Sequence, residues 1–301
     1  MSESSPISPP IDEAATELAT FGPVHLDVTE AERSLAFWAD LVGLQVIGKS
    51  DGLIELGAGG ETLLVLHPGA TSPSLRGHAG LYHLAIHLPD EPEFARVLAR
   101  LFAARTFMSP TDHVMSKAIY LDDPDGLGLE FTLETPERLG SMRITGPGME
   151  GVEIFDSSGR RRSGREPLDV QEVLGTLRDD DIARPLPAGT KIGHMHLHVG
   201  DIDANHRFYR DDLGFIDAND FGSGVDFHAN GRFKHRMAIN TWQGVGVSQP
   251  PAGTAGLRHF TITYDSPERL QGVLARVGEA TTHPDGHLVH DPAGNAMVLR
   301  A

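Results

Sequence analysis

Apolar and polar positions alternate in short runs that recur in the same order along the chain. Two matching segments are PVHLDVTEAERSLAFWADLVGLQVI from Pro23 and GHMHLHVGDIDANHRFYRDDLGFIDA from Gly193. Each opens with an alternating, strand-like run, passes through a polar turn, and continues with the apolar spacing of a helix. The pattern therefore predicts a strand followed by a helix at both places.

Two further segments share a second version of this plan. They are GLYHLAIHLPDEPEFARVLARLF from Gly80 and GLRHFTITYDSPERLQGVLARVG from Gly256, and each again joins an alternating strand to a helix. Both units end in a strand that follows an Asp-Pro-x-Gly turn, in DDPDGLGLEF from Asp122 and in HDPAGNAMVL from His290. The chain thus contains four related units in the order A, B, A′, B′.

These units predict an α+β fold made of four tandem βαβββ modules. In chain order, residues 1–20 form a flexible leader, 21–140 the first and second modules, and 191–301 the third and fourth. Residues 141–190 form a crossover segment, with one helix expected around 168–177 and no motif of recognisable chemistry.

Composition narrows the function classes. The 301 residues suggest two domains, and 25 Lys plus Arg against 42 Asp plus Glu give a formal net charge of −17, which argues against nucleic acid as a partner. Without any cysteine, a metal must be held by nitrogen and oxygen ligands. The leader has no signal-peptide pattern and no apolar run is long enough to span a membrane, so a soluble, cytoplasmic protein is expected.

Histidines mark one strand in particular. His194, His196 and His198 alternate in HMHLHV, so their side chains should lie on one face of the strand. Counting back seven residues from Asp201, at the turn between strand and helix, reaches His194, and the same count from Asp90 reaches His83. The equivalent residue is His259 in the fourth module and Pro23 in the first.

The segment from Thr111 to Glu130 carries the most constrained motif of the chain. It combines His113, the pair Ile119 and Tyr120, the turn Asp123-Pro124-x-Gly126, and Glu130. This motif, within βαβββ repeats of roughly 60 residues, resembles the vicinal oxygen chelate superfamily, which includes glyoxalases, bleomycin-resistance proteins and extradiol dioxygenases. The resemblance covers nearly the whole chain except the leader and the crossover.

The resemblance implies that the modules pair into two open barrels and that one pair closes around a single metal ion. In that superfamily the first and last strands supply the ligands, which correspond here to His83, His194 and Glu130. His196 and His198 share the strand face of His194 and stay open as alternatives to it. The metal implied is Fe(II), with Mn(II) as an alternative. Because Pro23 offers no donor atom, we expect the second module to pair with the third and the first with the fourth.

The resemblance also assigns the remaining site residues and a reaction. His235 would act as acid and base beside the metal, Tyr120 would hydrogen-bond the substrate, and His113 would orient a ring hydroxyl. The implied enzyme is a catechol 2,3-dioxygenase-like protein of aromatic hydrocarbon catabolism, acting on catechol-like diols with O2. The pattern leaves its oligomeric state open, including a homo-oligomer.

Two alternatives stay open at this point. One is another metal-dependent enzyme of the superfamily, such as a glyoxalase-like lyase or isomerase, although no second carboxylate stands at a ligand position. The other is a metal-free binding protein of the bleomycin-resistance kind, which would not need His83, Glu130, Tyr120 and His113 together. The fourth module lacks the carboxylate, since Val298 stands in its place.

Overall fold

The computed structural model describes residues 17–145, 151–229 and 235–301. It contains the order strand, helix and three strands four times, as the repeat predicts. The first module comprises β1 (Ala19–Val28), α1 (Ala31–Leu35), β2 (Gln45–Ser50), β3 (Leu53–Ala58) and β4 (Glu61–Pro68). The second comprises β5 (Gly80–His87), α2 (Glu91–Ala103), β6 (Ser109–Asp112), β7 (Ser116–Asp122) and β8 (Gly128–Glu134).

The last two modules repeat the plan after the crossover. The third comprises β13 (Lys191–His198), α4 (Ile202–Arg207), β14 (Ile216–Asp220), β15 (Gly224–His228) and β16 (Met237–Asn240). The fourth comprises β17 (Gly256–Tyr264), α5 (Pro267–Leu274), β18 (Thr281–His283), β19 (Gly286–His290) and β20 (Ala296–Arg300). The α+β class and the four modules are confirmed. Strand β1 begins at Ala19, within the span expected for the leader, and residues 1–16 of that span lie outside the described part.

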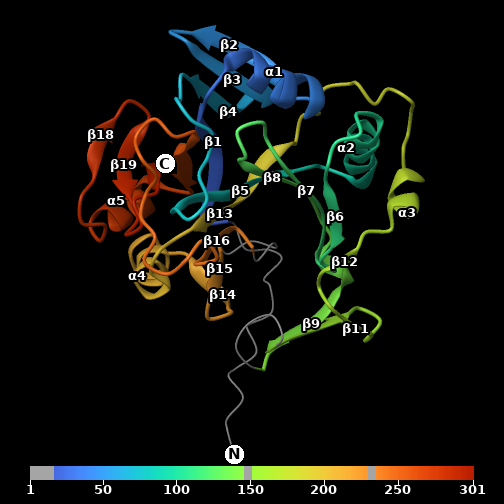
Figure 1. Cartoon of the computed structure of the whole chain (residues 1–301). Helices are drawn as coiled ribbons and strands as arrows, with labels where there is room; N and C mark the ends of the chain where they lie inside the picture. The colour runs from blue at the N-terminus through green and yellow to red at the C-terminus, as the bar shows by residue number, and fades with distance from the viewer. Residues whose placement is uncertain (1–16, 146–150, 230–234) are drawn as a thin grey trace, which may run out of the picture.

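Modules that follow one another within each half of the chain lie in different sheets, and each sheet joins one module from each half. An eight-stranded mixed sheet has the order β18-β19-β20-β17-β1-β4-β3-β2 and joins the first and fourth modules. A nine-stranded mixed sheet has the order β12-β6-β7-β8-β5-β13-β16-β15-β14 and joins the second and third (Figure 1). The predicted pairing of modules two and three is therefore confirmed. Both sheets have free edge strands, so neither closes into a barrel.

The first strands of the modules form both joints. In one sheet β5 pairs antiparallel with β13, and in the other β1 pairs antiparallel with β17. Each of these strands also pairs in parallel with the last strand of its own module, for example β5 with β8. The middle of each sheet is thus built from first and last strands, where an alternating sequence sends every second side chain to one face.

Short polar signals begin the helices and turn the strands. Asp90 caps α2 by accepting a hydrogen bond from the backbone N–H of Glu93 at 3.0 Å, and Asp201 does the same for α4 with Ala204 at 3.0 Å. In the Asp-Pro-x-Gly turn, Asp123 accepts from two backbone N–H groups at 2.9 and 2.8 Å. These local contacts explain why the repeat is readable in the sequence.

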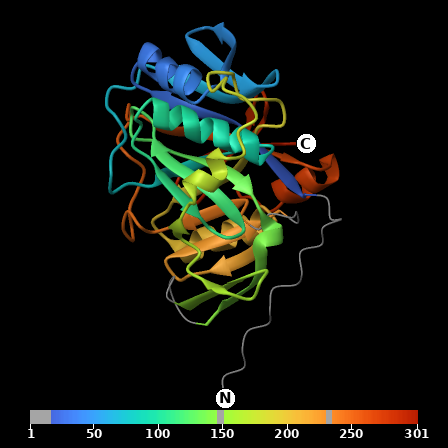
Figure 2. The ribbon, with the colours of Figure 1, turned by 90° about the vertical axis from the view of Figure 1, so that its right-hand side faces the viewer.

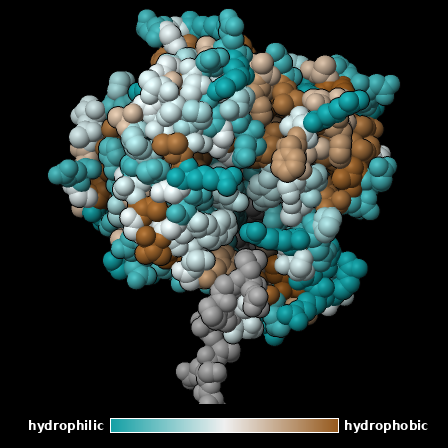
Figure 3. Space-filling view, viewed as in Figure 1, coloured by the Kyte–Doolittle hydropathy of each residue, from teal (hydrophilic) through white to brown (hydrophobic). Residues whose placement is uncertain are grey.

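The crossover is more structured than its composition suggests. It forms a small sheet of β9 (Leu139–Ile144), β10 (Val152–Asp156) and β11 (Arg161–Arg162), and then adds β12 (Glu166–Pro167) to the edge of the nine-stranded sheet. Helix α3 (Val170–Leu174) lies within the helix predicted at 168–177 and packs beside α2 (Figure 2). Apolar side chains gather on the side of the surface where α2 and α3 lie (Figure 3). Phe102 of α2 is among the exposed large apolar residues.

A buried arginine fastens the crossover to the modules. Arg100 of α2 donates to the carbonyl of Val42 at 2.8 Å and to that of Ile182 at 2.6 Å, and also to the carbonyl of Arg184. One guanidinium therefore holds the first module, α2 and the crossover together. Among the described residues, no helix is both long and apolar enough to cross a membrane.

We expect Arg100→Met to lower the free energy of unfolding by about 2–4 kcal/mol, because three carbonyls would lose a charged donor at a buried position. Urea denaturation followed by circular dichroism measures this change. Arg207→Met, which removes an exposed arginine from the end of α4, is the control and should change stability by less than about 0.5 kcal/mol. Equal stabilities of the two variants would contradict this role of Arg100.

Candidate metal centre

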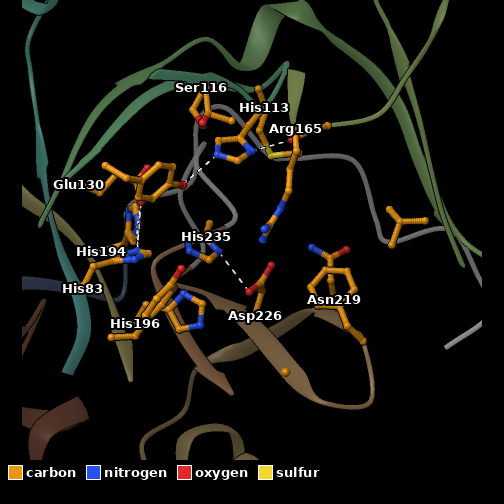
Figure 4. A pocket seen from close by; sticks show the side chains of 18 of the residues that line it. His83, His113, Ser116, Glu130, Arg165, His194, His196, Asn219, Asp226 and His235 are labelled. Carbon is orange, nitrogen blue, oxygen red and sulfur yellow. Dashed lines mark hydrogen bonds and ion pairs between the residues drawn. The ribbon is translucent and has the colours of Figure 1, made fainter. Parts of the chain in front are cut away.

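Three donor atoms from neighbouring strands form a compact triangle. His83 lies on β5, Glu130 on β8 and His194 on β13, and these strands are adjacent in the nine-stranded sheet. The Nε2 atoms of His83 and His194 are 3.2 Å apart, and they lie 3.0 and 3.1 Å from the same oxygen of Glu130, Oε2. The sequence predicted these three residues, and the structure brings them together (Figure 4).

The spacing of this triangle suits a metal ion. Cis ligands of an octahedral ion with bonds of about 2.1 Å are separated by roughly 3.0 Å, close to the three distances found here. Two imidazoles and one carboxylate on one face of an ion form the arrangement typical of non-haem Fe(II) oxygenases. Such an arrangement would leave the opposite positions of the ion available to other ligands.

The charges also favour a cation. Glu130 is 3% exposed, and its ion-pair partners among the described residues are imidazoles rather than Lys or Arg. Burial alone would raise the pKa of Glu130, but the imidazoles of His194 and His83 hold it well below its usual range. Burial lowers the pKa of His194 and keeps that ring neutral. A buried anion beside a neutral imidazole is stabilised by a divalent ion.

Outside the triangle, a hydrogen-bonded series fixes the tautomer of His194. His194 Nδ1 lies 2.9 Å from His87 Nε2, and His87 Nδ1 lies 2.8 Å from Glu134 Oε1. A carboxylate only accepts, so His87 carries its proton on Nδ1 and accepts from Nδ1–H of His194. The unprotonated Nε2 of His194 then faces the Glu130 carboxylate at 3.1 Å, an arrangement that needs a cation between the two atoms.

Glu134 is in turn held by Arg236. The guanidinium donates to Glu134 Oε1 at 2.9 Å and also pairs with Glu17, ahead of β1. Burial raises the pKa of Glu134, yet His87 and Arg236 lower it to about 2, so the carboxylate stays ionised. His87 packs so closely on β13 that a Cβ atom at Gly193 would lie 1.9 Å from its ring, which is why glycine stands there.

A second group of donors overlaps the first. His83, His196 and His235 also place ligand atoms within metal-binding distance of one another. This group lacks a carboxylate, and Nε2 of His196 already accepts a hydrogen bond from the Asn240 amide at 2.8 Å. The charge and the tautomer of the first triangle therefore make it the stronger candidate.

His235 reaches the same cavity as Glu130, as the predicted module pairing requires. Its ring centre lies 4.5 Å from that of His194, and its Nδ1 lies 3.2 Å from Asp226 Oδ1 on β15 (Figure 4). Burial alone would lower the pKa of His235, but the Asp226 carboxylate and Glu130 raise it. Since Nδ1 faces Asp226, proton exchange within the cavity falls to Nε2.

Tyr120 and His113 are joined by a hydrogen bond beside the triangle, where Tyr120 contacts His83. Nδ1 of His113 donates to the carbonyl of Gly164 at 2.6 Å, which leaves Nε2 to accept from the Tyr120 hydroxyl at 2.8 Å. Burial lowers the pKa of His113 and raises that of Tyr120 well above its usual value, so both side chains are neutral. All the predicted site residues thus lie around one cavity.

The cavity has a volume of about 650 Å³ and takes a wall from the crossover. Met142, Val152, Ile154 and Arg165 of that segment line it, although no motif there indicated a role. Sequence reasoning also missed Asp226, His87 and the other residues that support the site. A carboxylate paired with a histidine from a distant strand leaves no local pattern to find. The remaining lining residues include Tyr82, Ser116, His196, Asn219, Phe221, Ile239 and Trp242.

The histidines of the other sheet lie apart from this cavity. His25 Nδ1 is 2.9 Å from His67 Nε2, and the ring of His25 stacks on that of His259 with centres 4.0 Å apart. Burial lowers the pKa of His25 to about 3 and that of His259 to about 4, so both are neutral. His259 occupies the ligand position of its module, but no carboxylate joins it in a triangle like that of Glu130 among the described residues.

Comparisons with known proteins agree with this geometry. Residues 20–131 match the family model described as the Glyoxalase/Bleomycin resistance protein/Dioxygenase superfamily. The chain is 34% identical over 285 residues to the catechol-2,3-dioxygenase of Bacillus subtilis (strain 168), covering 92% of this chain and 95% of that protein. Among solved structures, it superposes on a Bacillus subtilis protein described as a dioxygenase with a TM-score of 0.60 at 13% identity, covering 95% and 86% of the two chains. It also superposes on glyoxalase I from Zea mays with a TM-score of 0.53 at 13% identity, covering 93% and 92%.

We expect His87→Phe to weaken metal binding by about 10- to 100-fold, because His194 would lose the acceptor that fixes its tautomer. Titration of the purified protein with Mn(II), followed by electron paramagnetic resonance, measures the dissociation constant. His87→Gln keeps an acceptor near Nε2 and should lose less affinity. If His87→Phe binds Mn(II) as tightly as the parent protein, the hydrogen bonds from His194 to His87 and Glu134 do not affect the metal affinity.

Proposed function

The chain belongs to the glyoxalase/bleomycin resistance protein/dioxygenase superfamily, and we propose that it is an extradiol ring-cleaving dioxygenase acting on catechol-like diols with O2. The observation that carries this proposal is the buried triangle of His83, Glu130 and His194, which opens into a cavity that also contains His235. Its similarity over most of its length to a catechol-2,3-dioxygenase supports the same reaction.

His83, His194 and Glu130 would hold the metal ion, which we infer to be Fe(II), with Mn(II) as the alternative. The chemistry supplied there is Lewis acidity toward the two catechol oxygens, which lowers their pKa, and electron transfer to O2. Glu130 contributes the negative charge, and Thr132 orients its other oxygen through a hydrogen bond of 2.8 Å.

His235 is the acid and base of the proposed reaction. Asp226 fixes its ring, so that Nε2 can take a proton from a catechol hydroxyl and return it later. Tyr120 and His113 bound the cavity beside the triangle. Because the proton of Tyr120 is directed to His113, the tyrosine oxygen can accept a hydrogen bond from the diol, and a change of partner would allow it to donate.

The overall change balances without a further reactant. Catechol and one O2 give one molecule of a muconic semialdehyde type: the ring C–C bond beside the diol breaks, and both oxygen atoms enter the product. Burial lowers the pKa of both His194 and His113, so these two rings are neutral beside the reacting groups.

A glyoxalase-like reaction has less support from the cavity. The other carboxylates that line it are Asp226 and Glu166, and they are paired with His235 and Arg162 respectively. Neither is available as a second carboxylate ligand of the triangle. A metal-free binding role leaves the buried charge of Glu130 unexplained.

Glu130→Ala should abolish stoichiometric iron while the fold remains, because the variant lacks the charge that neutralises the ion. Metal content after anaerobic reconstitution with Fe(II) measures this, and circular dichroism checks the fold. His259→Ala is the matched control: it removes a buried histidine from the equivalent strand of the other sheet and should retain the metal. Full metal retention by Glu130→Ala would refute the assignment of the triangle.

The reconstituted parent protein should turn catechols yellow when air is admitted, as the ring-fission product forms. His235→Ala should bind iron and catechol nearly as well but turn over about 10²–10⁴-fold more slowly, because the acid–base group is lost. Absorbance of the product under saturating substrate gives the rates. Parent-like turnover in His235→Ala would remove His235 from the reaction, and absence of product with every catechol would reject the proposed function.

A further inference from the structure

One charged side chain in the cavity wall has no role in the chemistry described above. Four residues with charged side chains other than histidine line the cavity: Glu130, Arg165, Glu166 and Asp226. The three carboxylates face His83 and His194, Arg162, and His235 respectively. Arg165 alone of these four makes no ion pair with any residue in the described part of the chain.

Arg165 lines the cavity, although the residue is also exposed to solvent. The residue follows Gly164, whose carbonyl binds His113, so the backbone here is anchored to the site. Figure 4 shows the side chain extending from the crossover into the cavity, toward Asn219 and the His235–Asp226 pair. Its positive charge acts on the side chains of Tyr82, Tyr120 and His113.

The neighbouring arginines behave differently. Arg161 pairs with Glu153 and Arg162 pairs with Glu166 and Asp112, within the crossover and with its neighbouring strand β6. Those pairs support the segment itself. In a chain of net charge −17, an arginine without a carboxylate partner at the cavity is a local exception to the prevailing charge.

The cavity is also larger than the proposed reaction needs. About 650 Å³ is enough for a drug-sized ligand, several times the size of unsubstituted catechol. Its lining includes apolar side chains, with Met142, Val152 and Ile154 from the crossover and Phe221 from the third module. This space suits an apolar substituent on the ring, and Arg165 suits an acidic group at the end of that substituent.

We infer that Arg165 forms a subsite for an anionic ring substituent, so that the preferred substrates are catechols with a short apolar chain that ends in a carboxylate. The inference rests on the proposed ring cleavage for its reactive end, because the diol must lie at the triangle. The guanidinium would bind the carboxylate through two parallel hydrogen bonds.

The test compares two substrates that differ only in charge, 3-(3,4-dihydroxyphenyl)propionate and its primary amide. The parent protein should cleave the carboxylate with a kcat/KM roughly 10- to 100-fold higher than that of the amide. Arg165→Met should bring this ratio close to one. Arg161→Met removes the same charge from the same segment outside the cavity, and it should keep the parent ratio.

Binding without turnover separates this inference from the proposed function. Trp242 lines the cavity, whereas the other tryptophan, Trp38, is fully buried in the first module, so quenching of Trp242 fluorescence reports binding under anaerobic conditions. Tighter binding of the carboxylate than of the amide, lost in Arg165→Met, would support the subsite even if no ring cleavage occurred. Equal binding of both compounds by the parent protein, or an unchanged preference in Arg165→Met, would overturn it.

Discussion

The site depends on the burial of one carboxylate, Glu130, between the imidazoles of His83 and His194. An ionised group away from water is costly unless an opposite charge meets it, and the ion-pair partners of Glu130 in the described part of the chain are His83 and His194. The hydrogen bonds beyond them run to His87, Glu134 and Arg236, so that the lone pair of His194 points at Glu130. This orientation of His194 is the one that a cation bound between His194 and Glu130 would require.

The sheet joint makes this cluster possible. His83 and His194 are 111 residues apart in the chain, and they meet because β5 pairs with β13 in the middle of the nine-stranded sheet. The same joint in the other sheet, between β1 and β17, places His25 beside His259 but adds no carboxylate. The two sheets therefore share the same strand pairing, but the triangle of two histidines and one glutamate lies in the nine-stranded sheet.

The crossover turns that framework into a cavity of defined shape. It is tied to the modules by Arg100 and Arg96, whose guanidinium groups bind carbonyls and carboxylates of the segment. So anchored, it contributes apolar walls and Arg165 to a site whose reactive groups all come from the second and third modules. In the proposed enzyme, the second and third modules would therefore hold the reacting diol, and the crossover would contact its substituent.

The sequence by itself determined the elements and most of the reactive residues, because these leave local signals. Strand alternation, the caps at Asp90 and Asp201 and the turn at Asp123 act over a few residues. The motif of His113, Tyr120 and Glu130 lies within the segment of three consecutive strands, β6 to β8. Even the pairing of modules two and three followed from a local fact, the missing donor at Pro23. Only the tertiary structure decided which of the alternating histidines meets Glu130, how His87 and Asp226 orient their partners, and that the crossover forms a wall. Those features depend on contacts between segments that are distant in the sequence. The packing of whole sheets sets the geometry of these contacts, so no local pattern in the sequence indicates them.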